Sequence, residues 1–192
     1  MPLDQQLIKD SKSYALARLD ELQSTVSQDL LLVDNFIYTP LLEKLINYIK
    51  AEQSNWLPEQ YQETKNRSKL NWAADTVLEE VHTVCESLTD PLNQIYHRRS
   101  RFLGITVWRD LEGYMIRPHT DQPLISMAIQ IYLSESELDL STKFLYKGKT
   151  IHPAYKKNSG YIQNNTGLIH FMSTPVPANH TRYSLYAIWT DS

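Results

Sequence analysis

Two residues near the middle of the chain have types and a spacing that suit metal chemistry. They are His119 and Asp121, in the stretch GYMIRPHTD over residues 113–121. Side chains at i and i+2 of an extended chain share a face, so this imidazole and carboxylate can reach one point. They would be two of the three ligands in the 2-His-1-carboxylate triad, which binds non-haem Fe(II) and leaves coordination sites open. His-x-Asp is a short pattern and equally describes two polar residues at a strand end, so a third ligand has to be found.

Three later histidines are candidates for that ligand. His170, in LIHFM over residues 168–172, has a strand pattern of its own, as an imidazole from a neighbouring strand requires. His180 lies only two residues before Arg182 and is expected at the start of the strand that carries Arg182. His152, in TIHPAY, is the third choice. We therefore favour His170 and keep His180 as the alternative.

The last strand pattern carries an arginine and a serine on one face. Arg182 and Ser184 are at i and i+2, and Leu185, Ala187 and Ile188 follow them. An arginine that faces an apolar interior needs an anionic partner, because an unpaired buried charge is very costly. The guanidinium fork can bind a carboxylate through two hydrogen bonds, and a serine hydroxyl can add a third. A structural ion pair or a surface arginine is the alternative interpretation.

The N-terminal half has the spacing of helices that support another layer. Leu41, Leu42, Leu45 and Ile49 recur on one helical face, after Thr39 as a plausible N-cap and Pro40 at the first helical position. The elements predicted for this half are a helix over 4–25, a strand over 30–36, a helix from Thr39, a polar connection over 51–69 and a helix over 71–88 that Pro91 ends.

From about residue 95 the pattern changes to short strands. β-Branched and aromatic residues cluster between turn signals, which favours a barrel or a sandwich. The predicted strands cover residues 101–110, 114–121, 124–133, 142–148, 149–156, 160–163, 168–172 and 182–189. We expect one α+β domain over 1–192, in which 1–94 is mainly helical support and 95–192 forms the β core.

Composition limits the class of protein. The chain is 42% hydrophobic and 21% charged, as in ordinary globular proteins, and it lacks the apolar run of a membrane span or a signal peptide, so we expect a cytoplasmic protein. Cys85 is the only cysteine, which excludes an intrachain disulfide. The net charge is −3, but residues 142–192 carry +5 and the remainder −8, which favours an anionic ligand near the suspected site. The absence of a long basic stripe disfavours nucleic acid as a partner.

The order of these pieces resembles the iron(II)- and 2-oxoglutarate-dependent dioxygenases, especially their prolyl-hydroxylase-like branch. GYMIRPHTD is similar to the strand with that family's His-x-Asp, and IQIYL, STKF and KKNSGYIQ to the segments that follow. LIHFMSTPVP and RYSLYAIW resemble the distal histidine and the Arg-x-Ser strand. The separations of 51 residues from His119 to His170, and 12 more to Arg182, suit this order. An alternative alignment, with 167–173 as the preceding strand, makes His180 the ligand.

The resemblance implies a double-stranded β-helix, a jelly-roll or cupin-like fold, with supporting helices at its N-terminal side. It implies that His119, Asp121 and His170 bind Fe(II). It also implies that Arg182 binds the distal carboxylate of 2-oxoglutarate, with help from Ser184 and from the hydroxyl of Tyr132. Trp108, Arg109 and Arg117 are candidates for the substrate mouth.

The activity implied is hydroxylation that consumes O2 and decarboxylates 2-oxoglutarate to succinate. The expected substrate is a protein or peptide side chain first, a free amino acid or small metabolite second, and nucleic acid last. The competing class is a non-catalytic cupin-like module that binds a metal or a small organic acid. The sequence does not fix the oligomeric state or the identity of the substrate.

Overall fold

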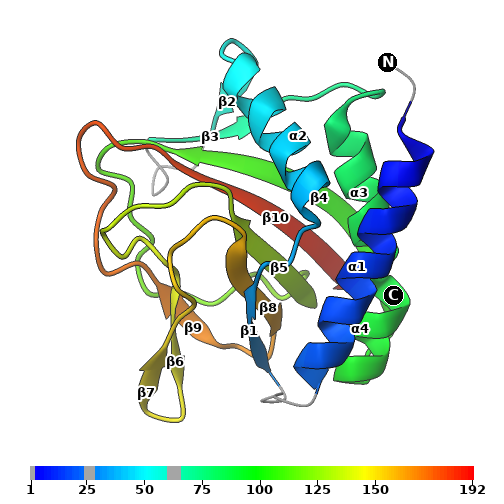
Figure 1. Ribbon diagram of the computed structural model, residues 1–192. Helices are drawn as coiled ribbons and strands as arrows, with labels where there is room; N and C mark the ends of the chain where they lie inside the picture. The colour runs from blue at the N-terminus through cyan, green and yellow to red at the C-terminus, as the bar shows by residue number, and fades with distance from the viewer. Residues whose placement is uncertain (1–2, 24–28, 60–65) are drawn as a thin grey trace.

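A computed structural model describes residues 3–23, 29–59 and 66–192 and contains two antiparallel sheets (Figure 1). The large sheet has the strand order β1-β8-β5-β10-β4-β3-β2, and the small sheet has the order β7-β6-β9. The strands of the large sheet are β1 (Leu30–Asp34), β2 (Trp56–Pro58), β3 (Arg67–Leu70), β4 (Ser100–Asp110), β5 (Met127–Tyr132), β8 (Ser159–Asn164) and β10 (Arg182–Asp191). Those of the small sheet are β6 (Lys143–Tyr146), β7 (Lys149–Ile151) and β9 (Ile169–Phe171).

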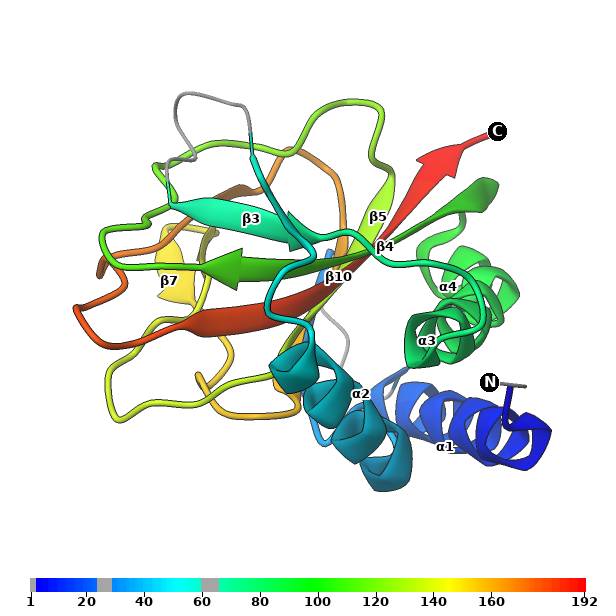
Figure 2. The same ribbon diagram turned by 90° about the horizontal axis from the view of Figure 1, so that it is seen from above.

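Four helices cover the outer face of the large sheet (Figures 1 and 2). They are α1 (Gln5–Gln23), α2 (Thr39–Ala51), α3 (Val77–Glu86) and α4 (Thr89–Tyr96). Buried leucines from each helix, such as Leu45 and Leu78, pack in one cluster with Leu185, Ala187 and Trp189 of β10. Burial of this apolar surface is the main stabilising contribution, about 25 cal/mol per Å².

Alternation along β10 separates this helix-side core from the interior between the sheets. Leu185, Ala187 and Trp189 belong to the helix-side core, so Arg182, Ser184 and Tyr186 face the other way. The small sheet closes that side through Phe144 of β6, whose ring is 4.7 Å from that of Tyr161 on β8. This arrangement confirms the expected α+β fold with helices outside a two-sheet β core.

Gly160 allows strands β5 and β8 to pair closely. A Cβ atom at this position would lie 1.8 Å from the backbone oxygen of Gln130 and 3.0 Å from the Cα of Ile131. No side chain can be accommodated there unless the backbone moves. A glycine is therefore required where β8 pairs with β5.

Several predicted elements need correction. Residues 114–121 do not form a regular strand. Their only bridge is the isolated one from His119 to His170, and the other backbone hydrogen bonds to this side are scattered, from the Met172 N–H to Ile116 and from the Val176 N–H to Tyr114. The helix predicted over 71–88 begins only at Val77, where the Thr76 hydroxyl caps the Leu78 N–H. Thr39 is the first residue of α2 rather than its N-cap, since Tyr38 holds that place.

The region that was expected to be mainly helical also supplies strands to the large sheet. β1 forms one edge beside β8, and the β2–β3 hairpin forms the other edge beside β4. The connection predicted over 51–69 therefore contains strand, although its residues 60–65, like residues 24–25 of the first predicted helix, lie outside the described part of the chain. Pro91 does not end the helical region, because it lies in the first turn of α4, where its missing N–H costs no hydrogen bond. Within the described residues, no helix has the length and apolar character needed to cross a membrane.

Candidate metal centre

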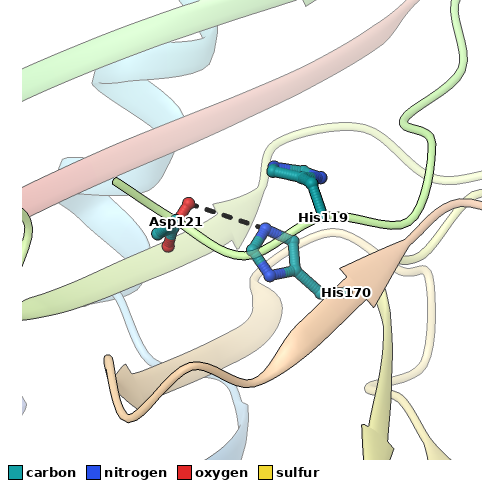
Figure 3. A group of neighbouring side chains, drawn as sticks. All are labelled: His119, Asp121 and His170. Carbon is teal, nitrogen blue, oxygen red and sulfur yellow. Dashed lines mark ion pairs between the residues drawn. The ribbon is translucent and has the colours of Figure 1, made fainter. Parts of the chain in front are cut away.

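The segment after β4 and the short strand β9 bring His119, Asp121 and His170 together (Figure 3). His119 and His170 form an isolated antiparallel bridge. The His119 N–H donates to the His170 carbonyl at 3.1 Å, and the His170 N–H donates to the His119 carbonyl at 2.8 Å. Two histidines that are 51 residues apart in the sequence are thus fixed opposite each other by backbone hydrogen bonds.

The three side chains are close enough to share one metal ion. One ligand atom from each lies within 4.8 Å of the other two. His170 Nε2 is 3.6 Å from Asp121 Oδ1, and the imidazole rings of His119 and His170 have centroids 4.3 Å apart. His170 is buried, Asp121 half-buried and His119 exposed. The group therefore lies near the surface and is open to solvent on the side of His119.

Backbone carbonyls orient both imidazoles for metal binding. His119 Nδ1 is 2.9 Å from the carbonyl oxygen of Arg117, and His170 Nδ1 is 3.2 Å from that of Leu168. A carbonyl only accepts, so each Nδ1 carries the proton and each Nε2 keeps a lone pair for the metal. Burial lowers the pKa of His170, although Asp121 acts in the opposite direction, and the neutral form of this imidazole is thereby favoured.

Two side chains from the large sheet hold the carboxylate of Asp121. Gln163 of β8 donates its amide N–H to Asp121 Oδ2, and the Tyr186 hydroxyl of β10 donates to the same oxygen at 3.3 Å. Oδ1, the oxygen that faces His170, is left for a metal ion. Partners of this kind fix the direction of a metal-binding carboxylate. Neither Gln163 nor Tyr186 was identified from the sequence, because a glutamine and a tyrosine on inward strand positions have no distinctive pattern.

A cavity of about 680 Å³ adjoins the three side chains. Its wall includes all three of them, together with Gln130, Tyr161 and Tyr186 from the large sheet. Trp108 and Arg117, both expected at a substrate mouth, also line it. Arg109 does not, because it lies over the ring of Trp56 at 4.6 Å on the other side of β4. The donor set and the space beside it suit a metal ion that binds further ligands.

Arg182, Ser184 and Tyr132 lie together in the interior, and none of them lines the cavity. Arg182 has no exposed surface, and its guanidinium carbon is 5.1 Å from the centroid of the Tyr132 ring. Its Nη1 donates to Asp110 Oδ2 and its Nε to the Leu140 carbonyl, whereas Nη2 is buried without a partner among the described residues. Ser184 accepts a hydrogen bond from the Gln130 amide at 3.1 Å. The anionic partner that the sequence required for Arg182 is thus at least partly Asp110.

The other candidate histidines lie away from the metal-binding group. His180 Nε2 is 3.5 Å from the Tyr155 hydroxyl, and His152 Nδ1 is 3.1 Å from the Ser141 hydroxyl and 3.7 Å from Asp139. Neither belongs to the group formed by His119 and Asp121. The structure therefore favours His170 over the alternative alignment with His180.

Comparison with known proteins supports the fold assignment. No protein-family model matches the sequence, and no curated protein matches it either. Solved structures do match: a Pseudomonas putida prolyl-4-hydroxylase superposes with a TM-score of 0.74 at 13% identity, over 93% of this chain and 99% of that one. A prolyl hydroxylase from Trichoplax adhaerens, in complex with a hypoxia inducible factor peptide fragment, gives 0.62 at 10% identity, over 98% and 94%.

A third solved structure of this fold holds a metal ion and 2-oxoglutarate. HygX from Streptomyces hygroscopicus, with nickel and 2-oxoglutarate bound, gives a TM-score of 0.66 at 9% identity, over 90% of this chain and 87% of that one. The chain thus has the fold shared by prolyl hydroxylases and other 2-oxoglutarate-dependent oxygenases, as its sequence resemblance predicted. Fold alone does not decide function, which has to be argued from the site.

Proposed function

We propose that the protein is an Fe(II)- and 2-oxoglutarate-dependent oxygenase that hydroxylates a protein or peptide side chain. The observation that carries this proposal is the group of His119, Asp121 and His170, whose ligand atoms lie within 4.8 Å of one another on the wall of a cavity. Two imidazoles and one carboxylate bind Fe(II) from one side and leave positions open for other ligands. The bound iron would supply the oxidation of a C–H bond, with 2-oxoglutarate and O2 as co-substrates.

The chain's own residues would place and orient the reacting groups. The carbonyls of Arg117 and Leu168 hold the protons on Nδ1 of the two histidines, and Gln163 and Tyr186 direct the Asp121 carboxylate. These contacts make the three ligands rigid before metal binds. As a result, the side chains lose less conformational entropy when the metal binds. Positioning of this kind is the usual contribution of a protein to cofactor chemistry.

Arg182 would bind the distal carboxylate of 2-oxoglutarate, assisted by Ser184 and Tyr132. In support, Arg182 Nη2 is a buried donor without an acceptor among the described residues, as a site for an added carboxylate requires. Its Nη1 is already bonded to Asp110, which offsets part of its charge. We therefore expect Arg182→Ala to raise the 2-oxoglutarate concentration needed for turnover more than it lowers the maximal rate.

A side chain of a larger molecule is the preferred substrate, with a free amino acid or similar small molecule second. His119 and the neighbouring Arg117 and Thr120 are exposed, so a bulky substrate can approach the metal side of the cavity. The solved structures of similar fold include one with a peptide fragment and one with hygromycin B bound. These two structures support a peptide and a small molecule as the classes of substrate to be tested.

Succinate formation tests the proposed function. Protein, Fe(II), ascorbate and 2-oxoglutarate are incubated in air, and succinate is quantified by NMR with and without candidate peptides and amino acids. We expect slow succinate release without substrate, stimulation by the true substrate, and none from an Asp121→Ala variant. If metal and 2-oxoglutarate bind but no succinate forms with any candidate, the competing function, a non-catalytic cupin-like module, is supported instead.

A further inference from the structure

One wall of the cavity carries a cation that no sequence motif indicated. Arg67, on β3, lines the cavity together with Trp108 of β4 and Tyr114. Among the described residues that line the cavity, Asp121 is the only acid, and it belongs to the metal-binding group. Arg117 is a second lining arginine, but it is exposed, so water solvates its charge.

The guanidinium of Arg67 is held rigidly. Its Nε and Nη2 donate to the two carboxylate oxygens of Asp110 at 2.6 and 3.0 Å. Its guanidinium carbon is 4.3 Å from the centroid of the Tyr114 ring and 4.6 Å from that of Trp108, in the range of cation–π contacts. Among the described residues, only Nε and Nη2 of Arg67 have hydrogen-bond partners, so Nη1 remains as a donor.

Two arginines share the carboxylate of Asp110. Asp110 is fully buried and accepts hydrogen bonds from both Arg67 and Arg182. The attraction of this carboxylate raises the pKa of both arginines, so both stay protonated, while burial raises the pKa of the adjacent Tyr114 and keeps it neutral. Among the described residues, the Asp110 carboxylate thus accepts hydrogen bonds from two guanidinium groups, and the carboxylate of Glu59 also acts on Tyr114.

Of these two arginines, Arg67 is the one that reaches the cavity. Arg182 is fully enclosed, whereas Arg67 is the member of the pair that lines the cavity. Glu59, whose N–H donates to the Arg67 carbonyl at 2.9 Å, is not part of the cavity wall. A charge in a partly buried site is favourable only when an opposite charge compensates it. The wall of the cavity therefore offers an anion a rigid guanidinium whose Nη1 has no hydrogen-bond partner among the described residues.

We propose that Arg67 binds a carboxylate of a molecule held in the cavity, and this inference rests on the proposed function. The planar guanidinium, fixed between two aromatic rings, presents Nη1 for a charge-assisted hydrogen bond that a carboxylate accepts. The carboxylate can come from the primary substrate, which would then be an acidic peptide or amino-acid-like compound, or from 2-oxoglutarate itself. Binding measurements separate these two sources.

The decisive variant is Arg67→Met, which removes the charge and keeps an unbranched chain over Trp108. It leaves Asp110 paired with Arg182 in a one-to-one ion pair, so we expect the variant to fold. Arg67→Lys keeps the charge without the planar fork. Arg109→Met is the matched control, because Arg109 also lies over a tryptophan, at 4.6 Å from the Trp56 ring, but does not line the cavity.

Each protein is loaded with Ni(II) and titrated in two arms by calorimetry and tryptophan fluorescence. The first arm adds 2-oxoglutarate. The second adds N-acetylglycine, with N-acetylglycinamide as its neutral match, in the presence and in the absence of saturating 2-oxoglutarate. Thermal unfolding of every variant confirms that it is folded.

We expect Arg67→Met to weaken carboxylate binding about tenfold or more in one arm, Arg67→Lys to be intermediate, and Arg109→Met to match the unsubstituted protein. A loss confined to N-acetylglycine identifies a substrate carboxylate, and a loss in the first arm identifies 2-oxoglutarate. The inference would be overturned if the unsubstituted and Arg67→Met proteins bound both carboxylates equally well. It would also be overturned if the unsubstituted protein did not prefer N-acetylglycine over its amide and the substitution left 2-oxoglutarate binding unaffected. Failure of the unsubstituted protein to bind Ni(II) or 2-oxoglutarate would instead count against the proposed function, and N-acetylglycine alone would still test Arg67.

Discussion

Removing the amide that orients Asp121 should weaken metal binding without unfolding the protein. Gln163 is 1% exposed on β8, its amide N–H donates to Asp121 Oδ2, and its Oε1 is buried without a partner among the described residues. Gln163→Met replaces this side chain by one of similar length that fills the same space. The carboxylate then loses one hydrogen bond, and a buried unsatisfied oxygen disappears.

The expected magnitude follows from these two changes. A hydrogen bond to a charged group contributes about 1.5–3 kcal/mol, and loss of such an outer partner typically costs about 10–100-fold in metal affinity. Tyr186 still donates to Oδ2 at 3.3 Å, so we expect a loss of roughly 10–30-fold. Without metal, removing the orphaned Oε1 offsets the lost bond, and Tm should change by less than about 4 °C.

Anaerobic titration with Co(II), followed by visible absorption and calorimetry, measures this affinity. Tyr186→Phe removes the longer of the two hydrogen bonds and should give a smaller loss than Gln163→Met. Unchanged metal affinity in a folded Gln163→Met protein would refute the role given to this contact. A fall in the Tm of the metal-free protein by 10 °C or more would show that the amide is mainly structural.

Three further outcomes are expected. Gly160→Ala should lower the free energy of unfolding by about 3 kcal/mol or more in urea titrations, because its Cβ would lie 1.8 Å from the Gln130 oxygen. Gly167→Ala, whose Cβ would have no atom within 4 Å, should lower it by about 1 kcal/mol, and equal losses in the two variants would contradict this prediction. Burial raises the pKa of the Cys85 thiol to about 12, so a thiol reagent at pH 8 should label only the unfolded protein, and rapid labelling of the native protein would be inconsistent with it. Burial lowers the pKa of His170 below 6.5, so the unfolded state takes up its proton at a higher pH than the folded state. The free energy of unfolding of the metal-free protein should therefore decrease as pH falls through about 6.5, and it should decrease less steeply in His170→Gln. An equally steep decrease in both proteins would show that His170 is not its cause.

The strands of the β core could be predicted because their residues follow local rules. In β10 the inward residues Arg182, Ser184 and Tyr186 alternate with the apolar residues of the helix-side core, and this two-residue period is visible in the sequence. The choice of His170 over His180 also had a local reason, namely that His170 has a strand of its own.

The parts that could not be predicted depend on contacts between distant segments. Residues 114–121 have the composition of a strand, but their one bridge joins His119 to His170, which is 51 residues away. The β2–β3 hairpin was missed because RSKL, the segment of β3, has no apolar alternation, and its inclusion in the sheet depends on pairing with β4. Since Arg67 lies in that strand, the positively charged wall of the cavity was missed as well.

The role of Asp110 also could not be predicted from the sequence. It ends the strand pattern of residues 101–110 as an ordinary acid, and only the pairing of Arg182 with Asp110 across β10 and β4 reveals that the two are partners. The prediction that the buried Arg182 needs an anionic partner is therefore confirmed. The structure supplies a carboxylate of the protein as one partner of Arg182 and leaves Nη2 without an acceptor among the described residues, so the binding of a ligand carboxylate stays a proposal.

The most direct test of the central claim is anaerobic addition of Fe(II) to the protein with saturating 2-oxoglutarate, followed by visible absorption spectroscopy. If His119, Asp121 and His170 bind iron together, a weak metal-to-ligand charge-transfer band should appear, saturate at one iron per chain, and be absent from Asp121→Ala and His170→Ala proteins that remain folded. A band of full intensity in either variant, or no band in the unsubstituted protein, would contradict the account.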